Sequence, residues 1–148
     1  MIARITGSVL ETFEKGVVLN TGPLAYTVYT PSIFSVGDEV VLHTQLIIRD
    51  DAHELYGFAT PQEKALFSIL IGVSGVGPKT ALGMLCLYTL PDLVRSIRTG
   101  DAKAIALVPG IGKKTAEKVV IDLKDKVEGF DTGGAPASID LIEALRSL

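Results

Sequence analysis

Two stretches of this chain follow the same pattern, and this repeat constrains the fold more than any other feature of the sequence. The segment GVSGVGPKTALGML covers residues 72–85, and LVPGIGKKTAEKVV covers residues 107–120. Aligning the two pairs Gly75 with Gly110, Val76 with Ile111, Gly77 with Gly112, Lys79 with Lys114, and Thr80 with Thr115. The chain therefore contains one structural unit, a tight turn that runs into a helix, twice.

Each unit is suited to presenting backbone N–H groups to an anion. The two glycines permit a tight turn with positive φ, and the apolar residue between them can pack into the core. Because the turn runs directly into a helix N-terminus, its free N–H groups and the positive end of the helix dipole form an anion site. Positive charge beside the two sites comes from Lys79, Lys113, Lys114 and Lys118.

Two anion sites on consecutive units suggest a polyanion as the ligand. We expect them to hold successive phosphates of one nucleic-acid backbone, whatever its base sequence, with an affinity that falls steeply with salt. The charge distribution agrees with this expectation, although the whole chain carries a net charge of −3. Residues 61–130 carry a net charge of +3, whereas residues 1–60 carry −4 and residues 131–148 carry −2.

Residues 1–60 have the sequence pattern of a small β-structure. Short runs rich in Val, Ile, Thr and Tyr are separated by turn signals at Gly16, at residues 21–23, at residues 37–38 and at Asp50-Asp51. The predicted strands are ARITGSV, GVVLN, LAYTVYT, EVVLHTQLIIR and HELYGF. Five strands with no covering helix favour a closed five-stranded barrel of the OB type over an open sheet.

Residues 61–130 are predicted to be helical. Thr60 and Glu63 form a capping-box pattern with Pro61 at the first helical position, so a helix begins there. Further helices are expected to open at Pro78, Pro91 and Lys113, and Gly100-Asp101 has the pattern of a C-cap followed by an N-cap. The fold class is therefore α+β, with a barrel followed by an all-α domain.

The chain is predicted to end in two short segments. Residues 131–138 are rich in Gly, Ala and Pro and are expected to form a flexible linker. Residues 139–148 have a helical apolar pattern but are too few to form a stable helix alone. No apolar run is long enough to cross a membrane and no signal peptide precedes the barrel, so we expect a cytoplasmic protein. Cys86 is expected to be a reduced thiol in the core.

The two Gly-apolar-Gly units resemble the helix-hairpin-helix motifs of DNA-repair and recombination proteins. Together with MIARITGSV, IIRDDAHELYGF, GVGPKTAL and PGIGKKTAEKVVIDLKDK, they make residues 1 to about 130 similar to the RuvA family of Holliday-junction-binding subunits. The resemblance implies that the chain is not an enzyme. It implies a homotetramer, with tetramer and octamer not distinguished by the sequence, whose barrels form the centre and whose helix-hairpin-helix domains follow the four DNA arms.

The resemblance also implies a set of partners and an acidic pin. The partners are four-way junction DNA, the ATP-driven motor RuvB and the resolvase RuvC. Asp50 and Asp51 match the family's acidic pin, although the residues alone favour a plain polar hairpin turn. Four copies of this carboxylate pair at the crossover would repel phosphates and keep the strands apart. Residues 139–148 resemble only the first helix of the family's motor-binding domain, so contact with RuvB is in doubt.

The expected site therefore binds DNA without catalysing a reaction, and no cofactor or metal is expected. Its DNA-binding residues are expected to be Gly75, Val76, Gly77, Lys79, Thr80, Gly110, Ile111, Gly112, Lys113, Lys114, Thr115 and Lys118. An ATPase is disfavoured because Pro78 follows Gly77 where a phosphate-binding loop needs lysine.

Several other readings remain open. A base-excision enzyme would need a recessed Asp or Lys, for which Asp122 and Lys124 are the candidates. His43 and His53 lack the spacing of a metal site. A single-strand binder would use exposed aromatic residues, but the barrel is acidic and its aromatic residues are expected in the core or in subunit contacts: Tyr26, Tyr29, Tyr56 and Phe58. A generic helix-hairpin-helix duplex binder and an adaptor that does not bind DNA are the remaining alternatives.

Overall fold

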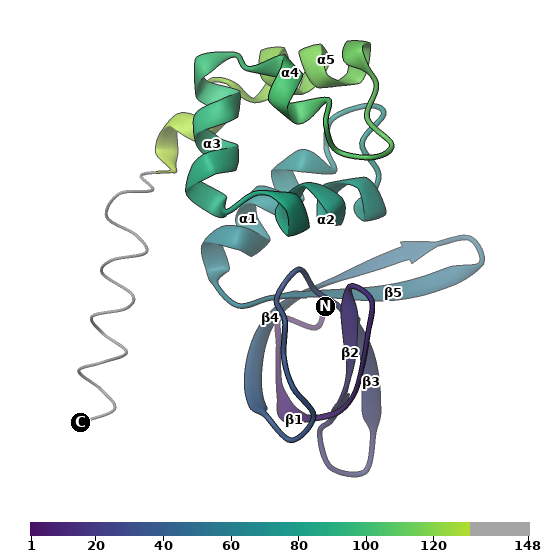
Figure 1. The fold of residues 1–148 in the computed structure, drawn as a ribbon. Coiled ribbons are helices and arrows are strands. Elements are labelled where there is room, and N and C mark those ends of the chain that lie inside the picture. Colours follow the sequence, from purple (N-terminus) through teal and green to yellow (C-terminus); the bar gives the residue numbers. More distant parts are fainter. Residues whose placement is uncertain (131–148) are drawn as a thin grey trace, which may run out of the picture.

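The computed structural model describes residues 1–130, which form a β-barrel followed by a group of helices (Figure 1). The predicted linker at 131–138 and the predicted helix fragment at 139–148 lie outside the described residues. None of the described helices combines the length and apolar character that a membrane span requires.

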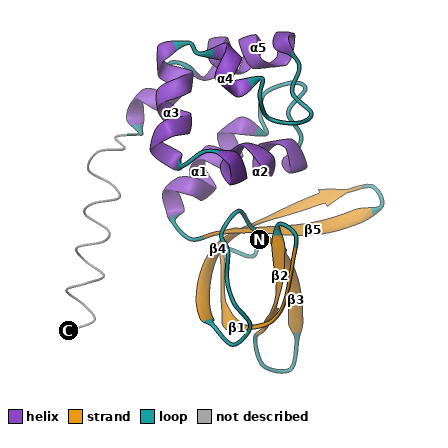
Figure 2. Cartoon of the chain, viewed as in Figure 1, coloured by secondary structure: helices purple, strands orange, loops and turns teal. Residues whose placement is uncertain are grey.

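Five strands close into a barrel, as the sequence predicted (Figure 2). The order around the barrel is β1-β2-β3-β5-β4, and β1 also pairs with β4. Neighbouring strands are antiparallel except for the single parallel pairing of β3 with β5 at Tyr29 and Tyr56. The strand bounds are Arg4–Phe13 (β1), Gly16–Asn20 (β2), Ala25–Tyr29 (β3), Glu39–Arg49 (β4) and Ala52–Phe58 (β5).

The barrel core comes from the alternation of side chains along the strands. In β4, for example, Val40, Leu42 and Thr44 are buried while the residues between them are more exposed. Such period-two burial places every second side chain inside. The first strand runs on to Phe13, four residues past the predicted stretch, and its register shifts between Val9 and Glu11. This bulge ends the alternation, because the residues that follow it are exposed.

Five helices and a short 3₁₀ turn follow the barrel. Their bounds are Pro61–Leu70 (α1), Pro78–Leu87 (α2), Leu90–Thr99 (α3), Ala102–Ile105 (α4), Lys113–Leu123 (α5) and Lys126–Gly129 (η1). The predicted capping box is confirmed, since the Thr60 side chain accepts a hydrogen bond from the Glu63 N–H at 3.2 Å. Gly100 ends α3 in the left-handed region with φ 79°, and Asp101 caps α4, also as predicted.

One apolar core joins the end of the barrel to the helices. Tyr56 and Phe58 on β5 are fully buried in the same cluster as the helical core residues. Phe67 of α1 packs on both, with ring centroids 5.1 Å from Tyr56 and 4.8 Å from Phe58. The Ser68 hydroxyl of α1 also hydrogen-bonds to the Gln45 side chain of β4. Barrel and helices are therefore packed together rather than joined by a free linker.

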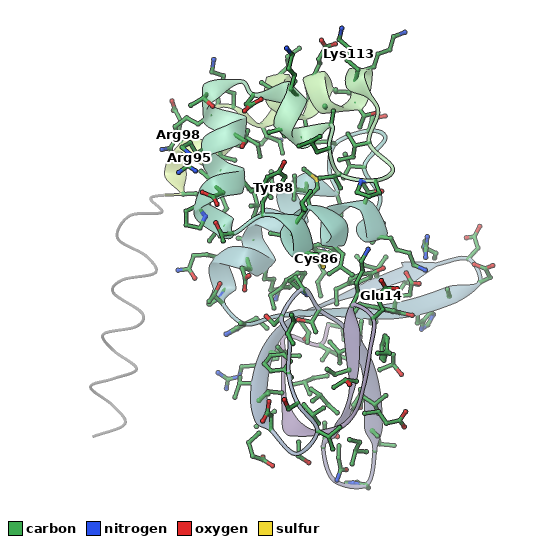
Figure 3. The ribbon with its side chains drawn as sticks, viewed as in Figure 1. Glu14, Cys86, Tyr88, Arg95, Arg98 and Lys113 are labelled. Atoms are coloured by element: carbon green, nitrogen blue, oxygen red, sulfur yellow. The ribbon has the colours of Figure 1, made fainter. Side chains whose placement is uncertain are left out.

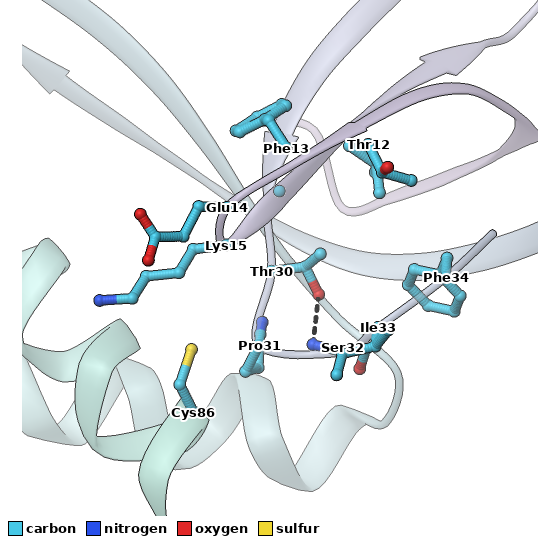
Figure 4. Close-up of a pocket in the computed structure, with 12 residues that line it drawn as sticks. Thr12, Phe13, Glu14, Lys15, Thr30, Pro31, Ser32, Ile33, Phe34 and Cys86 are labelled. Atoms are coloured by element: carbon cyan, nitrogen blue, oxygen red, sulfur yellow. Dashed lines mark hydrogen bonds between the residues drawn. The ribbon is translucent and has the colours of Figure 1, made fainter. Parts of the chain in front are cut away.

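The expectation that Cys86 lies in the core is wrong. The residue is exposed on α2, whose buried residues are Ala81, Leu82, Met84 and Leu85. At 100° per residue, position 86 falls off that face. Its sulfur instead faces a pocket between the helices and the barrel, beside Lys15 and Pro31 (Figure 4). Partial burial raises the pKa of the Cys86 thiol, which disfavours the thiolate.

Candidate nucleic-acid interface

The two repeated turns have the same backbone conformation. Gly75 and Gly110 have φ of 93° and 92°, the left-handed region in which glycine is favoured. The next residue closes each turn with a backbone hydrogen bond: Val76 N–H donates to Val73 at 3.0 Å, and Ile111 N–H donates to Val108 at 3.1 Å. Val76 and Ile111 are both buried, which confirms that the apolar residue of each triplet anchors its turn in the core.

The second glycine of each triplet has a different role from the one expected. Gly77 and Gly112 have φ of −92° and −87°, extended conformations that do not require glycine. They are the N-cap residues of α2 and α5, and a Cβ on either would meet nothing within 4 Å. Their lack of a side chain therefore leaves the space in front of the helix N-terminus open.

The open space leaves exposed the first-turn backbone N–H groups, one of which is bonded to an N-cap side chain in each of the other α-helices. The N-termini of α1, α3 and α4 each have a side-chain cap, from Thr60, Thr89 and Asp101 respectively. The N-termini of α2 and α5 have none. First-turn N–H groups have no partner within a helix, so these two helix ends present free donors and the positive end of the dipole at the surface. The α2 end has one donor fewer, because its first residue is Pro78.

The two turns pack against each other in a reciprocal way. A Cβ on Gly75 would lie 3.4 Å from the hydroxyl oxygen of Thr115, and a Cβ on Gly110 would lie 3.6 Å from that of Thr80. The aligned residues of the repeat thus exchange partners, as expected for two units related by an approximate twofold axis. The half-buried Thr80 and Thr115 pack the turns together. In Figure 1 both turns lie on the side toward which the β4–β5 hairpin projects.

The predicted lysines surround the two turns unequally. Lys79, Lys113, Lys114 and Lys118 are all exposed, and Lys113 lies at the end of the helical region away from the barrel (Figure 3). Among the described residues, the three lysines of α5 form no ion pair. Lys79 differs, because its Nζ is 4.0 Å from the Glu54 carboxylate and 5.9 Å from the centroid of the Tyr29 ring.

Asp50 and Asp51 occupy the tip of the long hairpin between β4 and β5. The strands pair from His43 and Phe58 out to Arg49 and Ala52, which leaves only the two aspartates in the turn. Both are exposed. The hairpin extends beyond the barrel wall in Figure 1, so its tip is free to meet a ligand.

Sequence reasoning missed Glu54, which lies on β5 opposite Ile47 of β4, in the outer part of this hairpin. Its carboxylate accepts hydrogen bonds from Arg49 Nη2 at 2.6 Å and from the Tyr56 hydroxyl at 3.1 Å. Burial first, and the Glu54 charge second, raise the pKa of Tyr56, so that this hydroxyl stays protonated and donates. The sequence gives no signal for Glu54, since its partners come from β4, β5 and α2.

The residues of the alternative metal site and of the alternative base-excision site do not come together in a pocket among the described residues. Within residues 1–130, no group of three or more His, Cys, Asp and Glu side chains could hold a metal ion. His43 lies opposite Arg4 on β1. Desolvation, followed by the charges of Arg4 and Lys64, lowers the pKa of His43. Asp122 and Lys124 are exposed at the end of α5 rather than recessed in a pocket.

Comparison with known proteins agrees with this architecture. Residues 1–57 match the family model described as the RuvA N terminal domain, and residues 67–125 match a SAM-like helix-hairpin-helix tandem. Three similar proteins are each named "Holliday junction branch migration complex subunit RuvA". That of Methylibium petroleiphilum is 40% identical over 159 residues and is matched over 83% of its length by all of this chain.

The other two proteins support the same assignment. The protein from Halorhodospira halophila is 42% identical, with 93% of this chain and 70% of its own length aligned. The protein from Pseudomonas entomophila is 37% identical, with 96% of this chain and 71% of its own length aligned. The matches span both the barrel and the tandem helix-hairpin-helix region, and on this basis the chain belongs to the RuvA family.

Proposed function

We propose that this protein binds four-way junction DNA without sequence preference, as a homotetramer, and holds the junction open for branch migration during recombination and repair. The observation that carries the proposal is the pair of uncapped helix N-termini at Gly77 and Gly112, set side by side in a region where the other α-helices are capped. Free amides at a helix N-terminus are a ready phosphate site.

The reciprocal packing of the turns favours one turn for each DNA strand. The two backbones of a duplex are antiparallel and are related by twofold axes perpendicular to the helix axis. A protein platform with approximate twofold symmetry can therefore make the same phosphate contact to each strand. This replaces the expectation that both turns follow one backbone. It rests on the Gly75–Thr115 and Gly110–Thr80 contacts.

The charges around the turns suit a contact to phosphate rather than to bases. In this proposal the amides at the two turns hold the phosphates, and Lys113, Lys114 and Lys118 add positive charge beside the second turn. Such contacts fix the position of a duplex without reading its sequence. Asp50 and Asp51 act as the pin, where their charges repel phosphates at the crossover and keep the exchanging strands separate.

In this proposal the protein is a DNA-binding subunit that works with other proteins in the cytoplasm. Its relatives are named as subunits of a branch migration complex. We assign ATP hydrolysis to a RuvB-type motor, and place a RuvC-type resolvase at the same junction. In this arrangement the chain itself catalyses no reaction.

The first test is a competition gel shift. An immobile four-way junction competes with linear duplex of the same arm sequence, at 50 and 200 mM salt. We expect a strong preference for the junction at both concentrations and a steep loss of affinity with salt. Equal binding to both DNAs would reduce the protein to a generic helix-hairpin-helix duplex binder. No binding to either DNA would favour an adaptor.

Neutralising the pin separates its role from DNA affinity. We expect Asp50→Asn with Asp51→Asn to bind the junction as tightly as the wild type or more tightly, because two phosphate-repelling charges are removed. Strand exchange at a mobile junction should change, as measured by fluorescence of labelled arms. Glu11→Gln with Glu14→Gln removes the same charge from exposed barrel positions and serves as the control. Loss of junction binding in the pin variant would refute the repulsion argument.

A further inference from the structure

The two pseudosymmetric turns differ in the contacts that their lysine side chains make with the rest of the protein. Lys79 and Lys114 occupy the same position of the repeat, two residues after the second glycine. Lys114 forms no ion pair with the described residues, whereas Lys79 lies 4.0 Å from Glu54 and over the ring of Tyr29. The first turn therefore has one nearby lysine, held by the barrel, while the second turn has three that are free of such contacts among residues 1–130.

The Glu54 carboxylate is well placed to hold Lys79 and to release it. Its side chain is only 12% exposed, whereas that of Lys79 is 71% exposed. The carboxylate oxygen that accepts from Arg49 and Tyr56 is Oε1, and the oxygen facing Lys79 is Oε2. When Lys79 moves away, Glu54 keeps two donors. The largely buried carboxylate thus stays satisfied whether Lys79 is present or absent.

We propose that Glu54 competes with DNA phosphate for Lys79, so that the first turn contributes less to DNA affinity than the second. The inference rests on the proposed function, because it requires that the turns bind phosphate. Glu54 acts as an internal carboxylate that occupies Lys79 in the free protein. A phosphate arriving at the α2 N-terminus takes over the lysine, which is exposed and tethered only by weak contacts.

The same contacts connect the first turn to the pin. Glu54 is two residues from the strand end at Ala52 and binds Arg49, so it links the two strands of the β4–β5 hairpin just behind its tip. Lys79 lies in the first helical turn of α2, directly after the Gly75–Gly77 turn. Release of Lys79 leaves the hairpin braced by the Arg49 and Tyr56 contacts while the helical region loses one attachment to the barrel. Binding of an arm at the first turn therefore releases the contact between α2 and the hairpin, while the Arg49 and Tyr56 contacts keep the pin in place.

A double-mutant cycle tests the competition. The variants are Glu54→Gln, Lys79→Ala and the double variant, and the probe is a linear duplex, with affinity measured by fluorescence anisotropy over a range of salt. We expect Glu54→Gln to raise affinity by a factor of about 2 to 5, the range set by an exposed ion pair. Because Lys79 meets the phosphate in the wild-type complex as well, the number of phosphate contacts is the same, and the slope of log affinity against log salt should change little. The gain in affinity should vanish in the Lys79→Ala background.

A matched variant excludes a general charge effect. Glu11→Gln removes one exposed carboxylate from the barrel, and Glu11 forms no ion pair among the described residues. It should leave DNA affinity nearly unchanged. An equal gain in affinity with and without Lys79 would overturn the proposal, as would a loss of affinity in Glu54→Gln. If wild-type protein binds no DNA, the proposed function itself fails.

The test does not depend on one substitution. Glutamine keeps the shape of Glu54 and the bond from Tyr56, and thermal unfolding checks that the variant folds. Should it not fold, Glu54→Asp withdraws the carboxylate from Lys79 by one methylene while keeping its charge. That variant should raise DNA affinity in the same direction, and an unchanged affinity would count against the competition.

Discussion

Gly112→Asp should make the protein slightly more stable while it weakens DNA binding by about 10- to 100-fold. Gly112 is an N-cap in an extended conformation, and a Cβ there meets nothing within 4 Å. Aspartate is among the best N-cap residues, so it should accept from the free amides of α5 and add a few tenths of a kcal/mol to the free energy of unfolding. The same carboxylate occupies the proposed phosphate donors and repels the phosphate, and the expected loss of affinity corresponds to about 1.4–2.8 kcal/mol.

The opposite signs of these two effects distinguish a binding role from a structural one. Thermal unfolding measures the first effect, and anisotropy with a linear duplex measures the second. Thr89→Asp is the matched control, because it adds the same charge at the N-cap of α3, which is already capped. That control should bind DNA nearly as well as wild type. Unchanged DNA binding in Gly112→Asp would remove the α5 N-terminus from the interface.

A second comparison separates the amides from the lysines. Lys113→Ala with Lys114→Ala leaves the N-cap untouched and removes two exposed charges beside the same turn. Its affinity should fall for every DNA, and the salt slope should flatten by about 1.8 if each lysine neutralises one phosphate.

Phe67→Ala should lower the free energy of unfolding by about 3–5 kcal/mol, the usual cost of removing a fully buried phenylalanine. Phe67 is 0% exposed and its ring lies 4.8–5.1 Å from the rings of Phe58 and Tyr56. The cavity would open where the barrel meets the helices, so both parts lose packing. Urea denaturation measures the change, followed by tyrosine fluorescence, to which the barrel contributes three of the four tyrosines, and by circular dichroism for the helices.

The two probes should also separate in this variant. In wild type the shared core predicts one transition, whereas without Phe67 the barrel and the helices should unfold at different urea concentrations. Leu107→Ala is the control, because Leu107 is an apolar residue that is 71% exposed. Its loss should change stability by no more than about 0.5 kcal/mol. A cost this small for Phe67 would mean that the helices do not depend on this contact.

Local signals in the sequence predicted most of the fold. The five strands, the capping box at Thr60 and the Gly100-Asp101 junction depend on neighbouring residues, and all were found, although β1 runs four residues past its predicted end. Features set by distant parts of the chain were not predictable. Burial of Cys86 was predicted wrongly because its apolar neighbours do not reveal which face of α2 they cover.

The candidate site was likewise predictable only in the features that neighbouring residues determine. The repeat located both turns and the apolar anchors Val76 and Ile111. It did not reveal that only the first glycine of each pair needs positive φ, because the second is free of steric demands in the fold. It also gave no sign of Glu54, whose partners are brought together only when β5 packs beside α2.

The reciprocal contact between the two turns suggests how a pair of DNA-binding turns can evolve from a single one. Each turn rests on the threonine of the other, so one unit alone leaves its own turn unsupported. Two identical short chains could form the same contact as a symmetric dimer, since an isologous interface uses one surface twice. Fusion of duplicated genes would then keep the geometry while freeing each copy to diverge. The proline of the first copy and the adjacent lysines of the second are differences that an identical pair could not have.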